Sequence, residues 1–209
     1  MTTSTRADEK FRGLRPQEWD EVTAPPQEIA DGTRALLPDH DGDLTLEELG
    51  ALVSAIAARP DLWEPMVVAD PGRRRYRLMY EDHRIDIWTL SWMDGQGTGF
   101  HDHDVSGVGL VAAKGMVVER QMLLPQGASR VEMRPDGEVR TGGAGYIHSV
   151  AWGEGEPAVS IHAYSPSLLH VGQYRVNEQG ILARHIEHGR QELMDFSIPD
   201  VDPSRADFS

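Results

Sequence analysis

The segment Gly97-Thr98-Gly99-Phe100-His101-Asp102-His103 contains two histidines one residue apart. In a β-strand, residues i and i+2 point to the same face, so both imidazoles would reach one point in space. Neutral imidazole is the commonest side-chain ligand for metals in proteins. The spacing alone is a weak indication, because surface strands carry such pairs by chance, so the interpretation depends on the surrounding residues.

A third histidine lies in a second motif further along the chain, Gly145-Tyr146-Ile147-His148. A glycine before His-x-His and a later Gly-x-x-His resemble the paired motifs of the cupin superfamily, whose fold is a jelly-roll β-barrel with the ligand site inside. This resemblance implies that His101, His103 and His148 hold one metal ion. The usual glutamate ligand, due five residues after His103, is replaced by Val108.

The missing carboxylate points to one branch of the superfamily, the thiol dioxygenases, which bind iron through three histidines. Two longer matches support this branch. Residues 91–103, Ser-Trp-Met-Asp-Gly-Gln-Gly-Thr-Gly-Phe-His-Asp-His, resemble the family segment Trp-x-x-Gly-x-x-(Ser/Thr)-x-x-His-Asp-His. Residues 156–166, Glu-Pro-Ala-Val-Ser-Ile-His-Ala-Tyr-Ser-Pro, are similar to its Glu-Pro-Ala-x-Ser-x-His-x-Tyr-Ser-Pro. Together the matches cover residues 73–166.

The second match contains three polar residues in alternation, Ser160, His162 and Tyr164, which share a face if they lie on one strand. The resemblance implies a hydrogen-bond relay in which Ser160 orients His162, His162 orients Tyr164, and Tyr164 meets the bound substrate and oxygen. The alternative is a buried strand whose polar groups are satisfied by their neighbours. Some relatives join this tyrosine covalently to a cysteine at the position of Val108, but this chain contains no cysteine.

A cation is needed to hold the substrate carboxylate. In cysteine dioxygenases an arginine lies on the strand before the Trp-x-x-Gly segment, and an alignment without gaps places Arg75 there. Arg73 and Arg77 share the face of Arg75 by alternation and are alternatives. A slip of one residue in register would turn all three to solvent and Leu78 to the pocket.

The ligand set favours a substrate that brings its own anion. Three neutral imidazoles leave Fe(II) with its two positive charges, and coordination lowers the pKa of a thiol far enough to deprotonate it. The thiol supplies all four electrons when both atoms of O2 end on sulfur, so no flavin, nicotinamide or keto acid is expected. The cofactor expected is Fe(II) alone, and the partners are a small thiol and O2.

Three functions are compatible with these motifs. The favoured one is a cysteine dioxygenase that converts L-cysteine to cysteine sulfinate. The second is a dioxygenase of 3-mercaptopropionate or another small thiol acid, which would differ mainly in how the carboxylate and amine are held. The third is a non-catalytic cupin that binds a metal or small molecule, although mere binding would not need the Ser-His-Tyr relay.

Composition excludes several other classes. The net charge is −14, with 34 acidic and 20 basic residues, and phosphate backbones would repel such a surface. No apolar run approaches the ~20 residues of a membrane span, and the first ten residues have no apolar core typical of a signal peptide. We therefore expect a cytoplasmic protein, a monomer that binds neither nucleic acid nor membrane.

The length of 209 residues indicates one domain. We expect an irregular segment over residues 1–40, polar and rich in proline, with one possible short helix. A single cupin domain should span residues 41–190, including a leading helix over 46–58. A polar tail should occupy residues 191–209.

The leading helix has clear start and stop signals. Thr45 as N-cap and Glu48 three residues later form a capping box, and Pro60 ends the helix. The acidic residues 39–43 before it suggest a calcium-binding EF-hand loop, but the glycine and glutamate of that loop are missing from their positions. The apolar stripe consists of Leu46, Leu49, Val53, Ile56 and Ala57.

From residue 73 the apolar period changes to two, which indicates strands. Arg84–Trp92 should pair with Arg73–Tyr80 across a turn at Glu81 and Asp82. Many short strands with glycine, proline and aspartate turns favour a β-sandwich or barrel, so we expect a mainly β, cupin jelly-roll fold with short N-terminal helices. The other strands expected are Gly107–Ala113, Met116–Leu123, Ser129–Met133, Gly145–Ala151 and Pro157–Tyr164, then a hairpin from Pro166 to about Ala183.

Two further histidines, His185 and His188, lie at i and i+3 and could chelate a metal if they were on a helix. The simpler interpretation, which we adopt, is a pair of solvated surface side chains.

Overall fold

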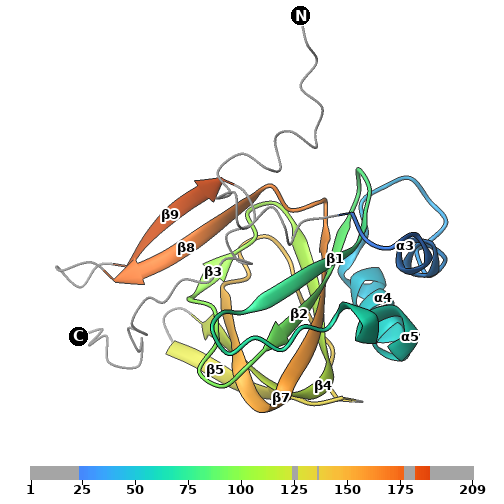
Figure 1. The fold of residues 1–209 in the computed structure, drawn as a ribbon. Coiled ribbons are helices and arrows are strands. Elements are labelled where there is room, and N and C mark those ends of the chain that lie inside the picture. Colours follow the sequence, from blue (N-terminus) through green and yellow to red (C-terminus); the bar gives the residue numbers. More distant parts are fainter. Residues whose placement is uncertain (1–23, 124–126, 136, 177–181, 189–209) are drawn as a thin grey trace, which may run out of the picture.

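The computed structural model describes residues 24–123, 127–135, 137–176 and 182–188. Helices come first, and antiparallel strands wrap around an interior beside them (Figure 1). The helices are α3 (Gln27–Arg34), α4 (Leu46–Ala57), α5 (Pro60–Trp63) and a 3-10 turn at Glu64–Met66. The strands are β1 (Arg75–Glu81), β2 (Asp86–Trp92), β3 (His101–Asp102), β4 (Gly107–Leu123), β5 (Gly127–Met133), β6 (Arg140–Gly142), β7 (His148–Ser165), β8 (His170–Val176) and β9 (Leu182–His188). The prediction of a mainly β fold with short leading helices is confirmed.

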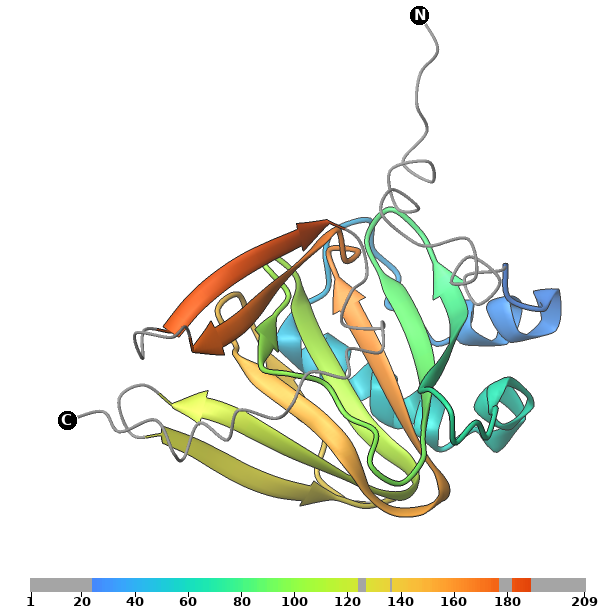
Figure 2. The same cartoon turned by 60° about the vertical axis from the view of Figure 1, so that its left-hand side comes forward.

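Strand β7 is the centre of the sheet. The strand order is β1-β2-β7-β3-β8-β9, and β4 pairs with β5, β6 and β7. Because β7 pairs with β2, β3 and β4, it joins the two parts of the fold that curve around the interior (Figure 2). The hairpin of β8 and β9 projects from one side of this curved sheet, and the helices cover the other side.

Strands β4 and β7 are each one long bent strand. The pairing between them shifts register around Gly115, whose φ is +67°. A Cβ at this position would lie 2.4 Å from the carbonyl oxygen of Glu154, so only glycine fits. Such β-bulges bend a strand without ending it. The strands predicted separately at Gly107–Ala113, Met116–Leu123, Gly145–Ala151 and Pro157–Tyr164 are therefore joined in pairs, which corrects that prediction.

Two buried apolar clusters lie on opposite faces of the sheet. The inner cluster fills the interior and includes Trp88, Leu90, Trp92, Leu110, Val117 and Tyr164. The outer cluster packs the sheet against the helices and includes Leu49, Val53, Ile56, Ile87, Val159 and Ile161. Alternation along each strand assigns neighbouring residues to different clusters.

Helix α4 begins as the sequence predicts. The Thr45 hydroxyl accepts a hydrogen bond from the backbone N–H of Glu48, and the Glu48 carboxylate accepts one from the backbone N–H of Thr45 at 2.8 Å. The helix ends at Ala57, three residues before Pro60. Of the predicted apolar stripe, Leu49, Val53 and Ile56 are buried together with Leu52, whereas Leu46 at the first turn is 41% exposed.

Helix α3 corresponds to the possible short helix in the N-terminal segment. Its Ile29 belongs to the outer cluster with the buried residues of α4. The packed part of the chain therefore begins before residue 41, the predicted domain start. Residues 1–23 and the predicted tail at 191–209 lie outside the described residues.

The last hairpin extends beyond the predicted end at Ala183. Strand β9 continues to His188, so His185 and His188 lie on a strand and not on a helix. The chelate considered for His185 and His188 requires a helix, so the strand excludes it. His185 is exposed, as expected for a solvated side chain. None of the helices in the described part of the chain is long and apolar enough to span a membrane.

Candidate metal centre

Three histidines from two neighbouring strands converge inside the curved sheet. His101 opens β3 and lies directly opposite His148, the first residue of β7, while His103 follows the end of β3. All three side chains are buried, and their candidate ligand atoms lie within 4.8 Å of one another. The convergence predicted from the His-x-His spacing and the Gly-x-x-His motif is therefore present in the structure.

Hydrogen bonds fix the proton position on two of these rings. Nδ1 of His101 lies 2.9 Å from the carbonyl oxygen of Gly99, and Nδ1 of His148 lies 2.8 Å from Oε1 of Glu119. A carbonyl or carboxylate only accepts, so each ring donates from Nδ1 and, when neutral, carries its lone pair on Nε2. This is the tautomer that a metal-binding histidine needs.

His148 supplies the test of whether the site fits a metal ion. Its Nε2 is buried and has no hydrogen-bond partner among the described residues. Burial lowers the pKa of His148 to about 3, and the hydrogen bond to Glu119 offsets this effect only in part, so the ring is neutral at pH 7. A buried lone pair without a donor is unusual, and a divalent cation would satisfy it. The donor set, three imidazole nitrogens without a carboxylate ligand, suits a first-row transition metal.

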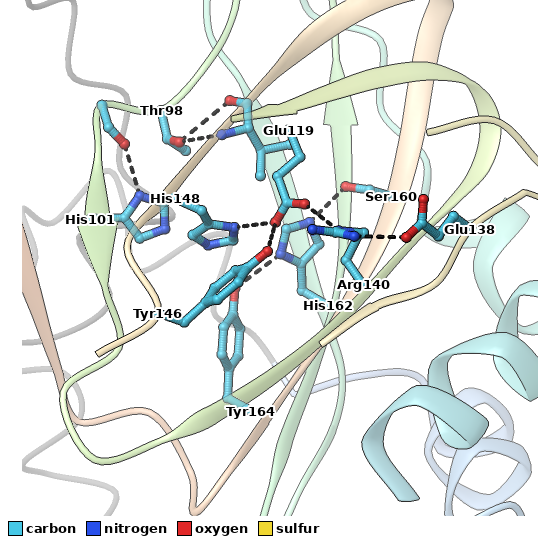
Figure 3. A network of polar contacts seen from close by, with 12 residues as sticks. Thr98, His101, Glu119, Glu138, Arg140, Tyr146, His148, Ser160, His162 and Tyr164 are labelled. Carbon is cyan, nitrogen blue, oxygen red and sulfur yellow. Dashed lines mark hydrogen bonds and ion pairs between the residues drawn. The ribbon is translucent and has the colours of Figure 1, made fainter. Parts of the chain in front are cut away.

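Behind His148 lies a charged network that the sequence analysis did not identify (Figure 3). Glu119 accepts hydrogen bonds from the His148 ring, from the Tyr146 hydroxyl at 2.8 Å and from Nε of Arg140 at 2.8 Å. Arg140 in turn binds Glu138 near the surface. The sequence does contain one indication of this network. Glu119 lies two positions after Val117, so in an apolar strand it would share the inward face with that valine.

Asp102, between the two histidines of the first motif, anchors this segment to the β8–β9 hairpin. Its carboxylate accepts two hydrogen bonds from Arg184, at 2.6 and 2.7 Å, and one from the Tyr174 hydroxyl at 2.7 Å. Burial would raise the pKa of Asp102, but these hydrogen bonds outweigh it and hold the pKa at about 2. The bidentate pair fixes the backbone between His101 and His103.

Ser160, His162 and Tyr164 form a continuous chain of hydrogen bonds along β7. Oγ of Ser160 lies 2.9 Å from Nε2 of His162, and Nδ1 of His162 lies 3.1 Å from the Tyr164 hydroxyl. The indole N–H of Trp92 donates to Ser160 at 2.8 Å, at the far end of the chain. The Tyr164 ring lies 4.9 Å from the ring of His103, measured between centroids, so the near end adjoins the three histidines.

Val108 lies directly opposite Tyr164 on strand β4. This is the position at which the family resemblance would place a crosslinked cysteine. Because the chain contains no cysteine, that crosslink cannot form here.

The arginines of β1 are placed differently from the prediction. Arg75 forms an ion pair with Asp70 at 2.7 Å, whereas its neighbours Tyr76 and Leu78 belong to the inner cluster. The pairing of β1 with β2 contains one extra residue between Leu78 and Tyr80. A shift of one residue exchanges the two faces of a strand. The structure has the slipped register that the sequence analysis left open: Leu78 lies inside, and Arg75 and Arg77 alternate with the inward residues, which corrects the expectation that Arg75 points inward.

The buried arginine at this end of the sheet is Arg74. Its side chain is 1% exposed, and its guanidinium carbon lies 4.9 Å from the centroid of the Trp92 ring. Trp92 is the residue that donates to Ser160, so Arg74 adjoins the far end of the relay. The sequence analysis named its neighbour on the opposite face instead.

A buried group of three histidines that could hold a metal ion, inside a curved antiparallel sheet, is typical of the cupins that have no carboxylate ligand. The sequence profile of the family "Cysteine dioxygenase type I" matches residues 22–177. The chain belongs to this family, and the predicted cupin jelly-roll fold is confirmed. The family consists of iron-dependent thiol dioxygenases that act on a small thiol and O2.

Individual relatives are distant. Human cysteine dioxygenase type 1 is 28% identical over 151 residues, which cover 68% of this chain and 76% of the human protein. The rat enzyme is 29% identical over 152 residues, with the same coverage. Among solved structures, TT1209 from Thermus thermophilus covers 50% of this chain and 93% of its own, with a TM-score of 0.44 and 20% identity. An RmlC-like cupin from Desulfovibrio desulfuricans covers 48% of this chain and 90% of its own, with a TM-score of 0.40 and 17% identity.

Proposed function

We propose that this protein is an Fe(II)-dependent cysteine dioxygenase that oxidises L-cysteine with O2 to cysteine sulfinate. The observation that carries the proposal is the combination of three convergent, buried histidines, His101, His103 and His148, with the Tyr164 relay beside them. When bound, Fe(II) would lower the pKa of the substrate thiol and bring the sulfur together with dioxygen. Both oxygen atoms end on sulfur, so the reaction needs no external reductant.

The relay would orient one proton toward the substrate. The Trp92 indole only donates, so Ser160 accepts from it and can give its own proton to Nε2 of His162. His162 then donates from Nδ1 to the Tyr164 oxygen, which directs the phenolic proton away from the relay. In this arrangement Tyr164 donates to the substrate carboxylate or to oxygen, while His162 and Ser160 act through Tyr164.

The carboxylate of the substrate needs a cation, and we assign this role to Arg74. Of the described arginines, Arg74 and Arg84 are the buried ones, and Arg84 lies in the turn that joins β1 to β2. Arg74 lies on the inward face and contacts Trp92. Arg75 remains the competing prediction from the family alignment, but it alternates with the inward residues Tyr76 and Leu78, which favours Arg74.

A second candidate function is oxidation of 3-mercaptopropionate. The observation that favours it is the absence of an inward-facing arginine at position 75 of β1, since the two activities differ in how carboxylate and amine are held. L-cysteine must be anchored through its sulfur, amine and carboxylate together. Removal of the amine therefore leaves polar groups of a cysteine site unsatisfied.

Oxygen consumption by the iron-loaded protein with a panel of thiols tests this choice. We expect kcat/KM for L-cysteine to exceed that for 3-mercaptopropionate by at least about tenfold. Arg74→Ala should raise KM for L-cysteine and retain iron, while the matched variant Arg75→Ala should leave KM unchanged. A preference for 3-mercaptopropionate would transfer the assignment to the second candidate. If Arg75→Ala rather than Arg74→Ala raises KM, the alignment-based assignment is correct.

A further inference from the structure

Glu119 is a buried acidic residue on the inward face of β4. Its side chain is 1% exposed, and it follows Val117 of the inner cluster at the next inward position. A carboxylate in such surroundings is expensive, because transfer of a charge from water into a protein interior costs several kcal/mol unless it is well compensated. Packing alone would be served better by an apolar residue of similar size.

The carboxylate forms an ion pair with Arg140 at 2.8 Å and is fully engaged by hydrogen-bond donors. Oε1 accepts from both the His148 ring and the Tyr146 hydroxyl, and Oε2 accepts from Arg140. Three donors, Arg140 from β6, Tyr146 just before β7 and His148 at its start, therefore fix the orientation of one carboxylate (Figure 3).

A glycine leaves room for the tyrosine of this network. The Tyr146 ring lies against Gly142, where a Cβ would come within 2.1 Å of the ring carbon Cγ. Any larger residue at position 142 would displace the tyrosine that orients Glu119. Arg140 is two residues from Gly142 on the same short strand β6. This strand therefore supplies both the glycine beside the Tyr146 ring and the arginine that binds Glu119.

The three histidines of the site are not anchored alike. Nδ1 of His101 donates to a neutral backbone carbonyl, that of Gly99, whereas Nδ1 of His148 donates to an anion. The histidines themselves contribute no negative charge to the site. Glu119 therefore places a negative charge behind His148 without occupying a ligand position. A carboxylate in this position makes a histidine a more basic ligand and restricts its ring to one orientation.

We propose that Glu119 is a positioning residue of the metal centre, which fixes His148 with Nε2 directed at the metal and strengthens it as a ligand through its charge. The inference rests on the proposed metal-dependent function, since it requires a metal at the three histidines. It predicts that removal of the charge weakens metal binding while the fold persists.

Glu119→Gln is the decisive variant, because its amide oxygen can still accept from His148 while the charge is removed. We expect the affinity for Zn²⁺, measured by competition with a chelator, to fall about 10- to 100-fold. Asp86→Asn is the matched control: Asp86 is a buried carboxylate that accepts hydrogen bonds from the Trp88 indole N–H and the backbone N–H of Leu168. This control should bind Zn²⁺ like the wild type.

His148→Ala separates the two ways in which the proposal can fail. If His148→Ala binds Zn²⁺ as tightly as the wild type, the three-histidine site is wrong and the proposed function falls with it. If His148→Ala loses Zn²⁺ but Glu119→Gln binds it like the wild type, only the role of Glu119 is refuted.

A measurement on the wild-type chain decides the question even if Glu119→Gln does not fold. In the Zn²⁺-loaded, ¹⁵N-labelled protein, long-range ¹H–¹⁵N correlations should show His148 protonated at Nδ1 and metal-bound through Nε2. The Nδ1 proton should exchange slowly with water, because it is buried against the carboxylate. A His148 bound through Nδ1 would overturn the proposal.

Discussion

From Val159 to Tyr164, strand β7 buries both of its faces, but the two faces have opposite chemistry. The inner face of this stretch carries the polar side chains of Ser160, His162 and Tyr164, and its outer face carries Val159, Ile161 and Ala163, which pack beneath the helices. Exposure does not distinguish the two faces, since all six residues are 0% exposed. His148, also 0% exposed, lies at the start of the same strand.

The difference shows how the fold separates stability from chemistry on one strand. The outer face gains free energy by removing apolar surface from water. The inner face must instead satisfy each buried polar group, and it does so through the chain from Trp92 to Tyr164 and through Glu119. Substitutions on the outer face should therefore change the free energy of unfolding, and those on the inner face should change metal binding and turnover.

The largest effect is expected at the start of the inner face. His148→Ala removes one of three ligands, so the variant should lose most bound iron and most turnover while it remains folded. Metal analysis of iron-reconstituted protein and oxygen consumption with L-cysteine measure the two losses. The control is His185→Ala, at an exposed position on β9, which should keep its iron. Full metal content and activity in His148→Ala would disprove the ligand assignment.

On the outer face, Ile161→Ala should lower the free energy of unfolding by about 2–5 kcal/mol, because it leaves a cavity in the outer cluster. The milder Ile161→Val should cost about 0.5–1.5 kcal/mol. Urea denaturation measures both. The folded fraction of each variant should bind iron in the same proportion as the wild type. Loss of iron at unchanged stability would mean that the two faces are not separable in this way.

The features that were predictable from the sequence are local. The capping box of α4 depends on Thr45 and Glu48, which are three residues apart, and the hairpin of β1 and β2 depends on alternation across a short turn. The histidine pair likewise follows from the period of a strand. These features need only the geometry of a single element or turn.

The features that were missed depend on tertiary structure. The register of β1 leaves Arg74 inside and Arg75 outside, and no residue in the sequence marks the extra position between Leu78 and Tyr80. Gly115 looks like a turn but lies within a bent strand. The partners of Glu119 lie 21 to 29 residues away along the chain, so the network becomes visible only when β4, β6 and β7 are assembled.

A smaller effect is expected at the other end of the inner face. Tyr164→Phe removes one oriented hydroxyl and should lower kcat about tenfold or more, with iron content and fold retained. Steady-state oxygen consumption and metal analysis measure the two properties. An unchanged kcat would reduce Ser160, His162 and Tyr164 to buried polar groups that merely satisfy one another.

The smallest loss of kcat is expected for Ser160→Ala, which is also the most specific test of the hydrogen-bond chain on the inner face. The variant leaves the Trp92 indole N–H without its acceptor, which should cost about 1–3 kcal/mol of stability. Its kcat should fall less than that of Tyr164→Phe, because Ser160 acts through His162. In the double variant Ser160→Ala/Tyr164→Phe, kcat should equal that of Tyr164→Phe alone, since the serine has no other route to the substrate. If the two losses multiply instead, the residues act independently, and the hydrogen-bond chain along β7 is not a functional unit.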